Sequence, residues 1–171
     1  MGWWHRYYAE AVARSSIGTW LCLRVGNRLA GATILYTIPL KPSIGVIYYI
    51  AVHEDLERRG LGKVLLASSE EILELRGCRI FVASTTVDND GSRKLFRSMG
   101  YREILVDELF AAEPNATELL VRALCSFEDD VVMLKGCEVN ELLELLKRNR
   151  AVIRGIWRRI CYEPWLRMRG G

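Results

Sequence analysis

The chain has 171 residues, half of them hydrophobic, and a formal net charge of +3. This length suits a single domain with its own core, and the hydrophobic content excludes an intrinsically disordered chain. No apolar run reaches the roughly 18 residues of a membrane-spanning helix, and the N-terminal sequence lacks the apolar core of a signal peptide.

The first half of the sequence predicts one helix followed by three strands. Residues 3–14 place Tyr7, Tyr8, Ala11 and Val12 on one helical face. Strands are predicted at 19–25, 29–38 and 44–52, with a hairpin connection between the first two. A helix at 63–76 follows, and Gly77 is its expected stop.

The second half alternates between short strands and helices. Strands are predicted at 79–85, 101–106 and 130–134, and helices at 92–99 and 116–126. A last helix is expected from about residue 138 to about residue 162, where Pro164 would end it. This order predicts an α/β fold, a mixed antiparallel and parallel sheet flanked by helices.

Five cysteines are spread along the chain, and their number is odd: Cys22, Cys78, Cys125, Cys137 and Cys161. No two are close enough in sequence for a zinc or redox pair, so we expect buried free thiols. With only two histidines, no metal site is expected. A reducing, cytoplasmic compartment fits this pattern best.

A glycine-containing turn lies between the third predicted strand and the helix that follows, with the sequence Glu57-Arg58-Arg59-Gly60-Leu61-Gly62-Lys63. A turn of this kind leaves unpaired N–H groups at the start of the helix. The helix dipole and three cations add positive potential there, so the turn predicts an anion-binding site.

The turn belongs to a longer pattern. It follows the strand end Ile50-Ala51-Val52 and precedes Asn89 and the run Ser92-Arg93-Lys94-Leu95-Phe96-Arg97-Ser98-Met99-Gly100-Tyr101. Together these segments resemble the general-control-related N-acetyltransferase (GNAT) superfamily, whose core motif is a strand, x-x-x-x-[QR]-x-x-G-x-[GA], a helix, a strand and N-x-x-[AS]-[RK]-x-[LI]-[YF]-x-x-x-G-[FY]. The resemblance covers residues 18–107 well and extends more weakly to 135.

This resemblance implies a GNAT-like acyl-CoA N-acyltransferase fold, with acetyl-CoA as the cosubstrate and an amine as the acceptor. Family members bind the coenzyme pyrophosphate through backbone N–H groups of the turn, here Arg58, Arg59, Gly60, Leu61, Gly62 and Lys63. The pantetheine arm would pair with Ile50, Ala51 and Val52, and the amide of Val52 would polarise the thioester carbonyl. Asn89, Ser92 and Phe96 complete the implied coenzyme site.

The sequence departs from the family pattern at the catalytic positions. Phe96 stands where many members carry a proton-donating tyrosine, Ser84 where some carry a glutamate, and Glu57 where Gln or Arg is usual. Tyr48 and Tyr49 occupy the other common base position; because strand residues alternate, one is expected to face the acceptor pocket and the other to pack under a helix. Candidate proton acceptors are water held by Ser84, Thr85, Tyr48 or Tyr49, the loop acids Glu57 and Asp88, and His53.

These departures leave two hypotheses for function. The first is an N-acetyltransferase that works by direct attack of the acceptor amine, without a covalent enzyme intermediate. The alternative is a non-enzymatic acyl-CoA-binding or interaction module with a degenerate acceptor site.

The ends of the chain lie outside the motif. We expect residues 1–135 to form the acetyltransferase domain, with a reduced N-terminal part, and residues 136–171 to form a basic amphipathic helix packed on it. An aromatic patch near the N-terminus, Trp3, Trp4, Tyr7 and Tyr8, suits the core or the acceptor pocket. From Lys147 onward there are eight Lys or Arg residues and one acid. Besides packing on the domain, such a helix could form a homodimer contact or bind a membrane surface or nucleic acid, and the last gives a third hypothesis for function. The modest net charge of +3 makes nucleic acid the less expected partner.

Overall fold

The computed structural model describes residues 3–169, and side chains from Tyr7 onward. The first half of the chain contains α1 (Trp3–Arg14), β1 (Thr19–Val25), β2 (Arg28–Ile38), β3 (Ser43–Val52), the short 3₁₀ helix η1 (Glu54–Leu56), α2 (Leu61–Leu75), β4 (Cys78–Thr85) and α3 (Asp90–Ser98). The second half contains β5 (Arg102–Leu105), α4 (Val106–Ala112), α5 (Pro114–Leu124), β6 (Val131–Lys135), α6 (Val139–Arg148), α7 (Arg150–Trp157), the π-helical turn η2 (Arg158–Tyr162) and α8 (Glu163–Arg169).

The six strands form one mixed sheet in the order β1-β2-β3-β4-β6-β5, which confirms the predicted fold class. All neighbouring strands are antiparallel except β3 and β4, which α2 connects as a parallel pair. This pair is short. It runs from Ser43 opposite Cys78 to Val46 opposite Val82, and in the described chain β3 has no strand partner on that side beyond Val46.

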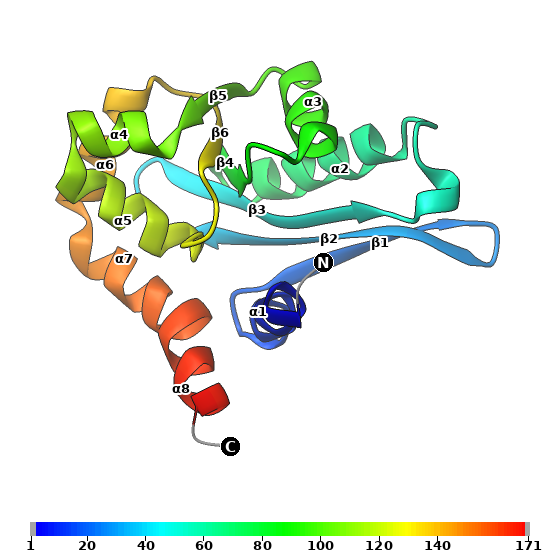
Figure 1. The fold of residues 1–171 in the computed structure, drawn as a ribbon, viewed down its shortest axis with the longest axis horizontal. Coiled ribbons are helices and arrows are strands. Elements are labelled where there is room, and N and C mark those ends of the chain that lie inside the picture. Colours follow the sequence, from blue (N-terminus) through cyan, green and yellow to red (C-terminus); the bar gives the residue numbers. More distant parts are fainter. Residues whose placement is uncertain (1–2, 170–171) are drawn as a thin grey trace.

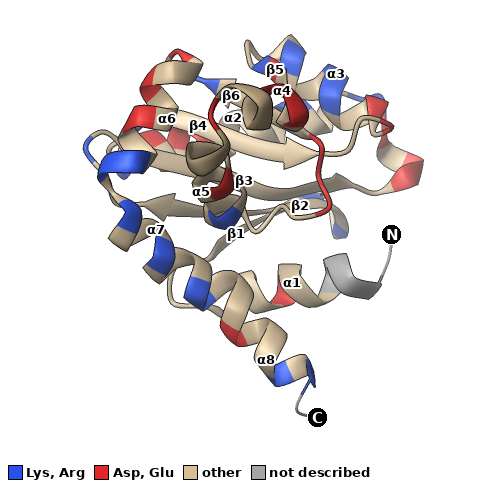
Figure 2. Cartoon of the chain, turned by 60° about the vertical axis from the view of Figure 1, so that its left-hand side comes forward, with Lys and Arg blue, Asp and Glu red and all other residues tan. Residues whose placement is uncertain are grey.

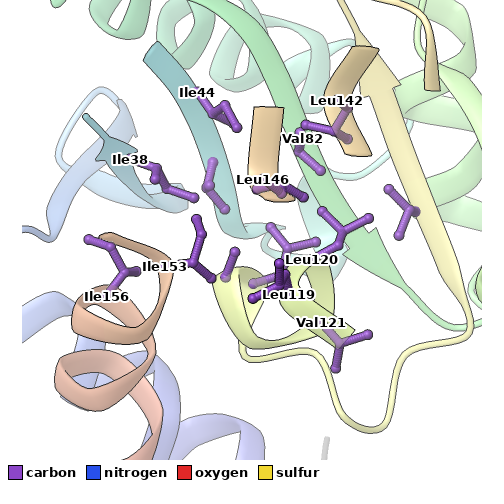
Figure 3. Close-up of a cluster of buried hydrophobic side chains, with 14 of the residues drawn as sticks. Ile38, Ile44, Val82, Leu119, Leu120, Val121, Leu142, Leu146, Ile153 and Ile156 are labelled. Carbon is purple, nitrogen blue, oxygen red and sulfur yellow. The ribbon is translucent and has the colours of Figure 1, made fainter. Parts of the chain in front are cut away.

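Helices cover both faces of the sheet (Figure 1): α2 and α3 lie on one face, and α1, α5 and α7 lie on the other. The α2-side cluster of buried side chains consists of Leu35, Ile47, Leu66, Leu73, Cys78, Phe81, Ala83, Phe96, Tyr101, Val131 and Met133. The larger α5-side cluster joins Ile38, Ile44 and Val82 of the sheet to Leu120 of α5, Leu146 of α6 and Ile153 of α7 (Figure 3).

A β-bulge changes the expected alternation of the two tyrosines in β3. Ile34 of β2 lies opposite Tyr49 and Leu35 lies opposite Ile47, so Tyr48 is the extra residue on β3. A bulge of this kind interrupts the strict two-residue alternation of a strand. Both Tyr48 and Tyr49 pack against the α5-side cluster, and the expectation that they would face opposite sides was wrong.

The C-terminal segment is not the single predicted helix. It breaks at Asn149, between α6 and α7, and widens into the π-helical turn before α8. Pro164 does not end the segment, because it is the second residue of α8 and the helical conformation continues into it from η2 through Glu163. Ile153, Ile156 and Ile160 bury this segment against the rest of the chain. Figure 2 shows its basic residues as blue segments along α7.

Two cysteines form a disulfide, Cys125 at the end of α5 and Cys161 in η2. The expectation of free thiols was wrong for this pair, which is separated by 36 residues, because linear spacing carries no signal for a bridge closed by tertiary packing. Cys22, Cys78 and Cys137 are free, and Cys22 is exposed rather than buried. None of the described helices is both long and apolar enough to cross a membrane.

Candidate active site

A large cavity forms where β3 and β4 separate. Its volume is about 1560 Å³, more than the roughly 300–1,000 Å³ of a site for one small ligand. Residues from both faces of the sheet line it, including Ile50, Gly62 and Phe96 on the α2 side and Tyr48, Ser84 and Trp157 on the α5 side. The opening in the sheet therefore joins two half-sites, one on each face.

The α2-side half is built around the glycine turn. Gly60 has φ 80°, in the left-handed region that glycine adopts without strain, and α2 begins at the next residue. The first amides of α2 have no helical carbonyl partner and point out of the N-terminal end. Arg58, Gly60, Leu61, Gly62 and Lys63 line the cavity, whereas Arg59 is not among its described lining residues.

The end of β3 presents a backbone donor to the opening. The N–H of His53 donates to the carbonyl oxygen of Ala30 in β2 at 2.8 Å. Neighbouring amides of an extended strand point to opposite edges, so the N–H of Val52 points away from β2 and into the opening. Ile50, Ala51 and Val52 all line the cavity there.

The start of α3 forms the opposite wall of this half. The Oδ1 atom of Asn89 accepts a hydrogen bond from the N–H of Ser92 at 3.1 Å, so the side chain caps α3 while it lines the cavity. Phe96 is buried and packs edge-on against Tyr101, with ring centroids 4.9 Å apart. A phenyl ring has no proton to give to a leaving group.

The α5-side half contains a carboxylate that the motif did not indicate. Ser84 Oγ donates a hydrogen bond of 2.6 Å to Asp129 Oδ2, and both residues line the cavity with Tyr48 and Tyr49. Burial raises the pKa of the Tyr48 hydroxyl, and the charges of Asp129 and Tyr8 raise it further. Tyr48 therefore stays protonated at neutral pH, which removes its hydroxyl as a base.

The other sequence candidates are spread around the cavity. Glu57, Asp88 and Thr85 are lining residues. His53 is not among the described lining residues; its ring accepts from the N–H of Asp55 and contacts Arg28 on an exposed surface. Of the N-terminal aromatic patch, Tyr8 lines the cavity and Tyr7 donates to the carbonyl oxygen of Pro164 at 2.8 Å. The side chains of Trp3 and Trp4 lie outside the described residues.

Sequence reasoning missed the outer wall of the α5-side half. This wall comprises Cys125, Ser126, Phe127, Glu128, Trp157, Cys161, Tyr162 and Trp165. These residues follow the recognised motif, and only folding brings them beside Ser84. The one signal in the sequence for a site here was the acidic run Glu128-Asp129-Asp130 at the start of the last predicted strand.

Comparison with known proteins gives a consistent result. The profile described as "Acetyltransferase (GNAT) family" matches residues 2–101. The GCN5-related N-acetyltransferase 4, chloroplastic, of Arabidopsis thaliana is 29% identical over 68 residues, which are 40% of this chain and 23% of that protein. The L-2,4-diaminobutyric acid acetyltransferase of Bordetella parapertussis is 28% identical over 105 residues, which are 57% of this chain and 56% of that protein.

Among solved structures, a GNAT family acetyltransferase from Elizabethkingia anophelis with acetyl-CoA bound matches with a TM-score of 0.51 at 17% identity. The match covers 71% of this chain and 78% of that one, and it supports the fold. The family profile over residues 2–101 confirms the resemblance inferred from the motif. The chain spans just over half of one curated relative and about a quarter of the other.

Proposed function

Because the chain belongs to the acetyltransferase (GNAT) family, we propose that it is an acyltransferase that moves an acetyl group from acetyl-CoA to the nitrogen of an amine. The opening between β3 and β4 carries the proposal, since the amide of Val52 points into it and the N-terminus of α2 stands beside it. The acceptor nitrogen would attack the thioester carbonyl directly, with no covalent enzyme intermediate. The C–N bond would form as the C–S bond breaks, and CoA would leave as a thiolate that takes up the second proton of the nitrogen.

The α2-side half fits the coenzyme. The amides of Arg58 to Lys63, with the side chains of Arg58 and Lys63, would hold the pyrophosphate. Glu57 also lines this region, but two lining cations and the dipole of α2 outweigh it. Bound acetyl-CoA would supply an acetyl group activated as a thioester. Ile50, Ala51 and Val52 would pair with the pantetheine arm, and Asn89, Ser92 and Phe96 would flank it.

Val52 is proposed to stabilise negative charge during transfer. Its amide is aimed at the opening by the strand itself, so it needs no rearrangement to donate to the thioester carbonyl oxygen. A donor fixed in this way is typically worth a few kcal/mol in the transition state.

Asp129 is proposed to receive the acceptor's proton. An alkylammonium has a pKa near 10, so it must lose a proton before it can attack. Ser84 Oγ accepts the amine proton while its own proton moves along the existing 2.6 Å hydrogen bond to Asp129 Oδ2. Tyr48 and Tyr49 line the same half and are proposed to orient the acceptor through their hydroxyl groups.

The proposal also covers the domain division, the cellular location and the partners of the protein. Residues 1–135 would form the acetyltransferase domain and 136–171 an extension that packs on it. The protein is also proposed to act in the cytoplasm. Persistent disulfides in that compartment are found chiefly in thermophilic organisms. A homodimer through the exposed edge strand β1 is compatible with the proposal, and nucleic acid is not a proposed partner.

The test combines coenzyme binding with turnover. Gly60→Asp and Gly60→Asn are matched, because both residues tolerate the left-handed conformation and only aspartate adds a charge. Calorimetry should give weaker acetyl-CoA binding for Gly60→Asp than for Gly60→Asn, by about tenfold or more. Equal affinities for the two variants would contradict the coenzyme site.

Turnover separates the enzyme from the non-enzymatic alternative. Thiol release from acetyl-CoA should depend on added amine across a panel of arylalkylamines, polyamines and N-terminal peptides. Acetyl-CoA binding without thiol release on any of these amines would favour a binding module instead.

A further inference from the structure

Three aromatic rings from the C-terminal segment stack along the wall of the α5-side half of the cavity. The rings of Trp157 and Tyr162 are 5.0 Å apart and 28° from parallel, and those of Tyr162 and Trp165 are 6.0 Å apart and 21° from parallel. All three residues line the cavity. We refer to these three rings as the aromatic ladder.

The π-helical turn makes the ladder possible. Trp157 and Tyr162 are five residues apart, and in a regular α-helix such residues point about 140° away from one another. In η2 the N–H of Glu163 bonds to the carbonyl of Arg158, an i to i+5 bond, so each turn takes in more residues. The extra residue brings Trp157 and Tyr162 onto the same side. π-Helical turns are frequent at functional sites.

Two arginines occupy the ends of the ladder. The guanidinium of Arg122 lies 5.2 Å from the ring centre of Trp157, and that of Arg169 lies 4.4 Å from the ring centre of Trp165. The ring faces are thus occupied by one another and by the two guanidinium groups. What remains for the cavity are ring edges, which form a flat, largely apolar wall rather than a cage for a cation. The indole Nε1–H of Trp157 is buried there without a hydrogen-bond partner among the described residues.

The disulfide connects this wall to an acidic loop. Cys161 lies in η2, and its partner Cys125 directly precedes the loop that carries Glu128 and Asp129 into the cavity. The charge of Glu128 contributes to the raised pKa of Tyr8, and that of Asp129 to the raised pKa of Tyr48. Both carboxylates therefore add negative charge to the α5-side half of the cavity, on the side away from the glycine turn.

Charge is distributed unevenly along the cavity, and Glu57 is the acid that lies beside the cations of the glycine turn. The cations among its described lining residues are Arg58, Lys63 and Lys94, and all three lie on the turn, α2 or α3. The α5-side lining offers two carboxylates and the aromatic ladder. A ligand that fits this half carries positive charge at the Asp129 end and an apolar body along the rings.

We propose that the C-terminal segment determines acceptor specificity, and that the acceptor is a primary monoamine with an aromatic body, of the arylalkylamine class. This inference rests on the proposed acetyl transfer and adds its substrate class. A polyamine carries positive charges along its whole length, and any charge that lies on the ring edges rather than beside Glu128 or Asp129 loses its hydration without a counter-ion. A peptide N-terminus would bring backbone polar groups to the same wall.

The test uses 2-phenylethylamine, spermidine and an alanine-terminated peptide as acceptors. Wild type should prefer 2-phenylethylamine in kcat/KM by about tenfold or more, as expected from burying one aromatic ring. Tyr162→Ala removes the middle rung and should raise KM for 2-phenylethylamine about tenfold, with KM for acetyl-CoA unchanged. Tyr162→Phe keeps the ring and should keep KM. Leu166→Ala, an exposed apolar residue of α8 outside the cavity lining, is the matched control.

The outcomes separate the two levels of the proposal. Better turnover of spermidine or peptide, or an unchanged KM in Tyr162→Ala, would overturn the arylalkylamine inference and leave acetyl transfer standing. Absence of turnover with every amine would overturn both. Calorimetric titration of 2-phenylethylamine into the CoA-saturated protein adds a readout independent of turnover, in which Tyr162→Ala should again weaken binding about tenfold.

Discussion

Ser84 Oγ donates a 2.6 Å hydrogen bond to Asp129 Oδ2, and this bond joins the end of β4 to the loop before β6. Ser84 also lies two residues beyond Val82, the last residue of β4 that pairs with β3. The hydroxyl group is therefore placed at the point where the sheet opens. The positions at which the resemblance implies a base hold Tyr48, Tyr49 and Ser84, and the carboxylate bonded to Ser84 belongs to a different element.

Asp129→Asn should lower kcat while KM for acetyl-CoA stays within about twofold. The amide keeps the shape of the side chain and still accepts from Ser84, but it cannot take a proton, and loss of general base assistance typically costs about 10²–10⁴-fold. Because the neutral amine fraction grows with pH, activity of the variant should recover steadily up to the pKa of the acceptor. Steady-state rates from pH 6 to 10 measure this.

Asp130→Asn is the control for that substitution. Asp130 Oδ1 accepts from the N–H of Val87 at 2.6 Å, and an amide oxygen preserves this bond. The same charge is removed one residue away, so a similar loss of kcat in Asp130→Asn would mean that the loop's overall charge matters and that Asp129 is not the proton acceptor.

Ser84→Ala tests whether the proton passes through the hydroxyl. In the proposed relay Ser84 lies between the amine and Asp129, so its removal should lower kcat by a factor close to that of Asp129→Asn. A double variant should then be no slower than either single variant, because both interrupt one path. Full activity of Ser84→Ala would show direct transfer to Asp129.

Reduction of the Cys125–Cys161 bond should destabilise the protein. Closing a loop between residues 36 apart in sequence restricts the unfolded chain, by about 3–4 kcal/mol in the chain-entropy account. Urea denaturation with and without reductant measures the difference, and Cys22→Ser, at an exposed free thiol, should change nothing. Unfolded, unreduced protein should titrate three thiols; five, the full cysteine count, would contradict the bond.

The sequence predicts those features that depend on a few neighbouring residues, and it does not predict those that depend on tertiary packing. The strands, the glycine turn and Asn89 were predictable because periodicity and turn chemistry act over a few residues. Tyr48 shows why the direction of a side chain can escape such a prediction. A tyrosine suits any strand, and the bulge that places Tyr48 and Tyr49 on one face depends on the pairing with β2. Asp129, Trp157 and Cys161 reach the site only by tertiary packing, so no local pattern identifies them.

Stability should fall above pH 10 because of buried tyrosines. Burial raises the pKa of Tyr48 and Tyr36 in the folded state above the ordinary value near 10. Below pH 10 both states keep the proton; above it the unfolded chain releases the proton first, so unfolding becomes more favourable as pH rises. Each such tyrosine contributes a slope of up to about 1.4 kcal/mol per pH unit. Urea midpoints at pH 9, 10 and 11 should fall less steeply in Tyr48→Phe, and an unchanged slope would contradict the assignment.

Gly31→Ala should weaken coenzyme binding from the opposite side of β3. Gly31 lies opposite Val52, and a Cβ there would stand 2.6 Å from the carbonyl oxygen of Ala51 and 2.9 Å from Leu65 Cδ1. Backbone cannot yield as a side chain does, so β3 must shift, at a cost of about 1–3 kcal/mol in unfolding free energy. The shift displaces Ala51 and Val52, and calorimetry should show reduced acetyl-CoA affinity. Gly155→Ala is the control, because a Cβ there meets nothing within 4 Å. It should stabilise α7 by about 0.5–1 kcal/mol and leave the coenzyme affinity unchanged. A stable Gly31→Ala with normal acetyl-CoA affinity would mean that the close approach of Gly31 to Ala51 does not position β3.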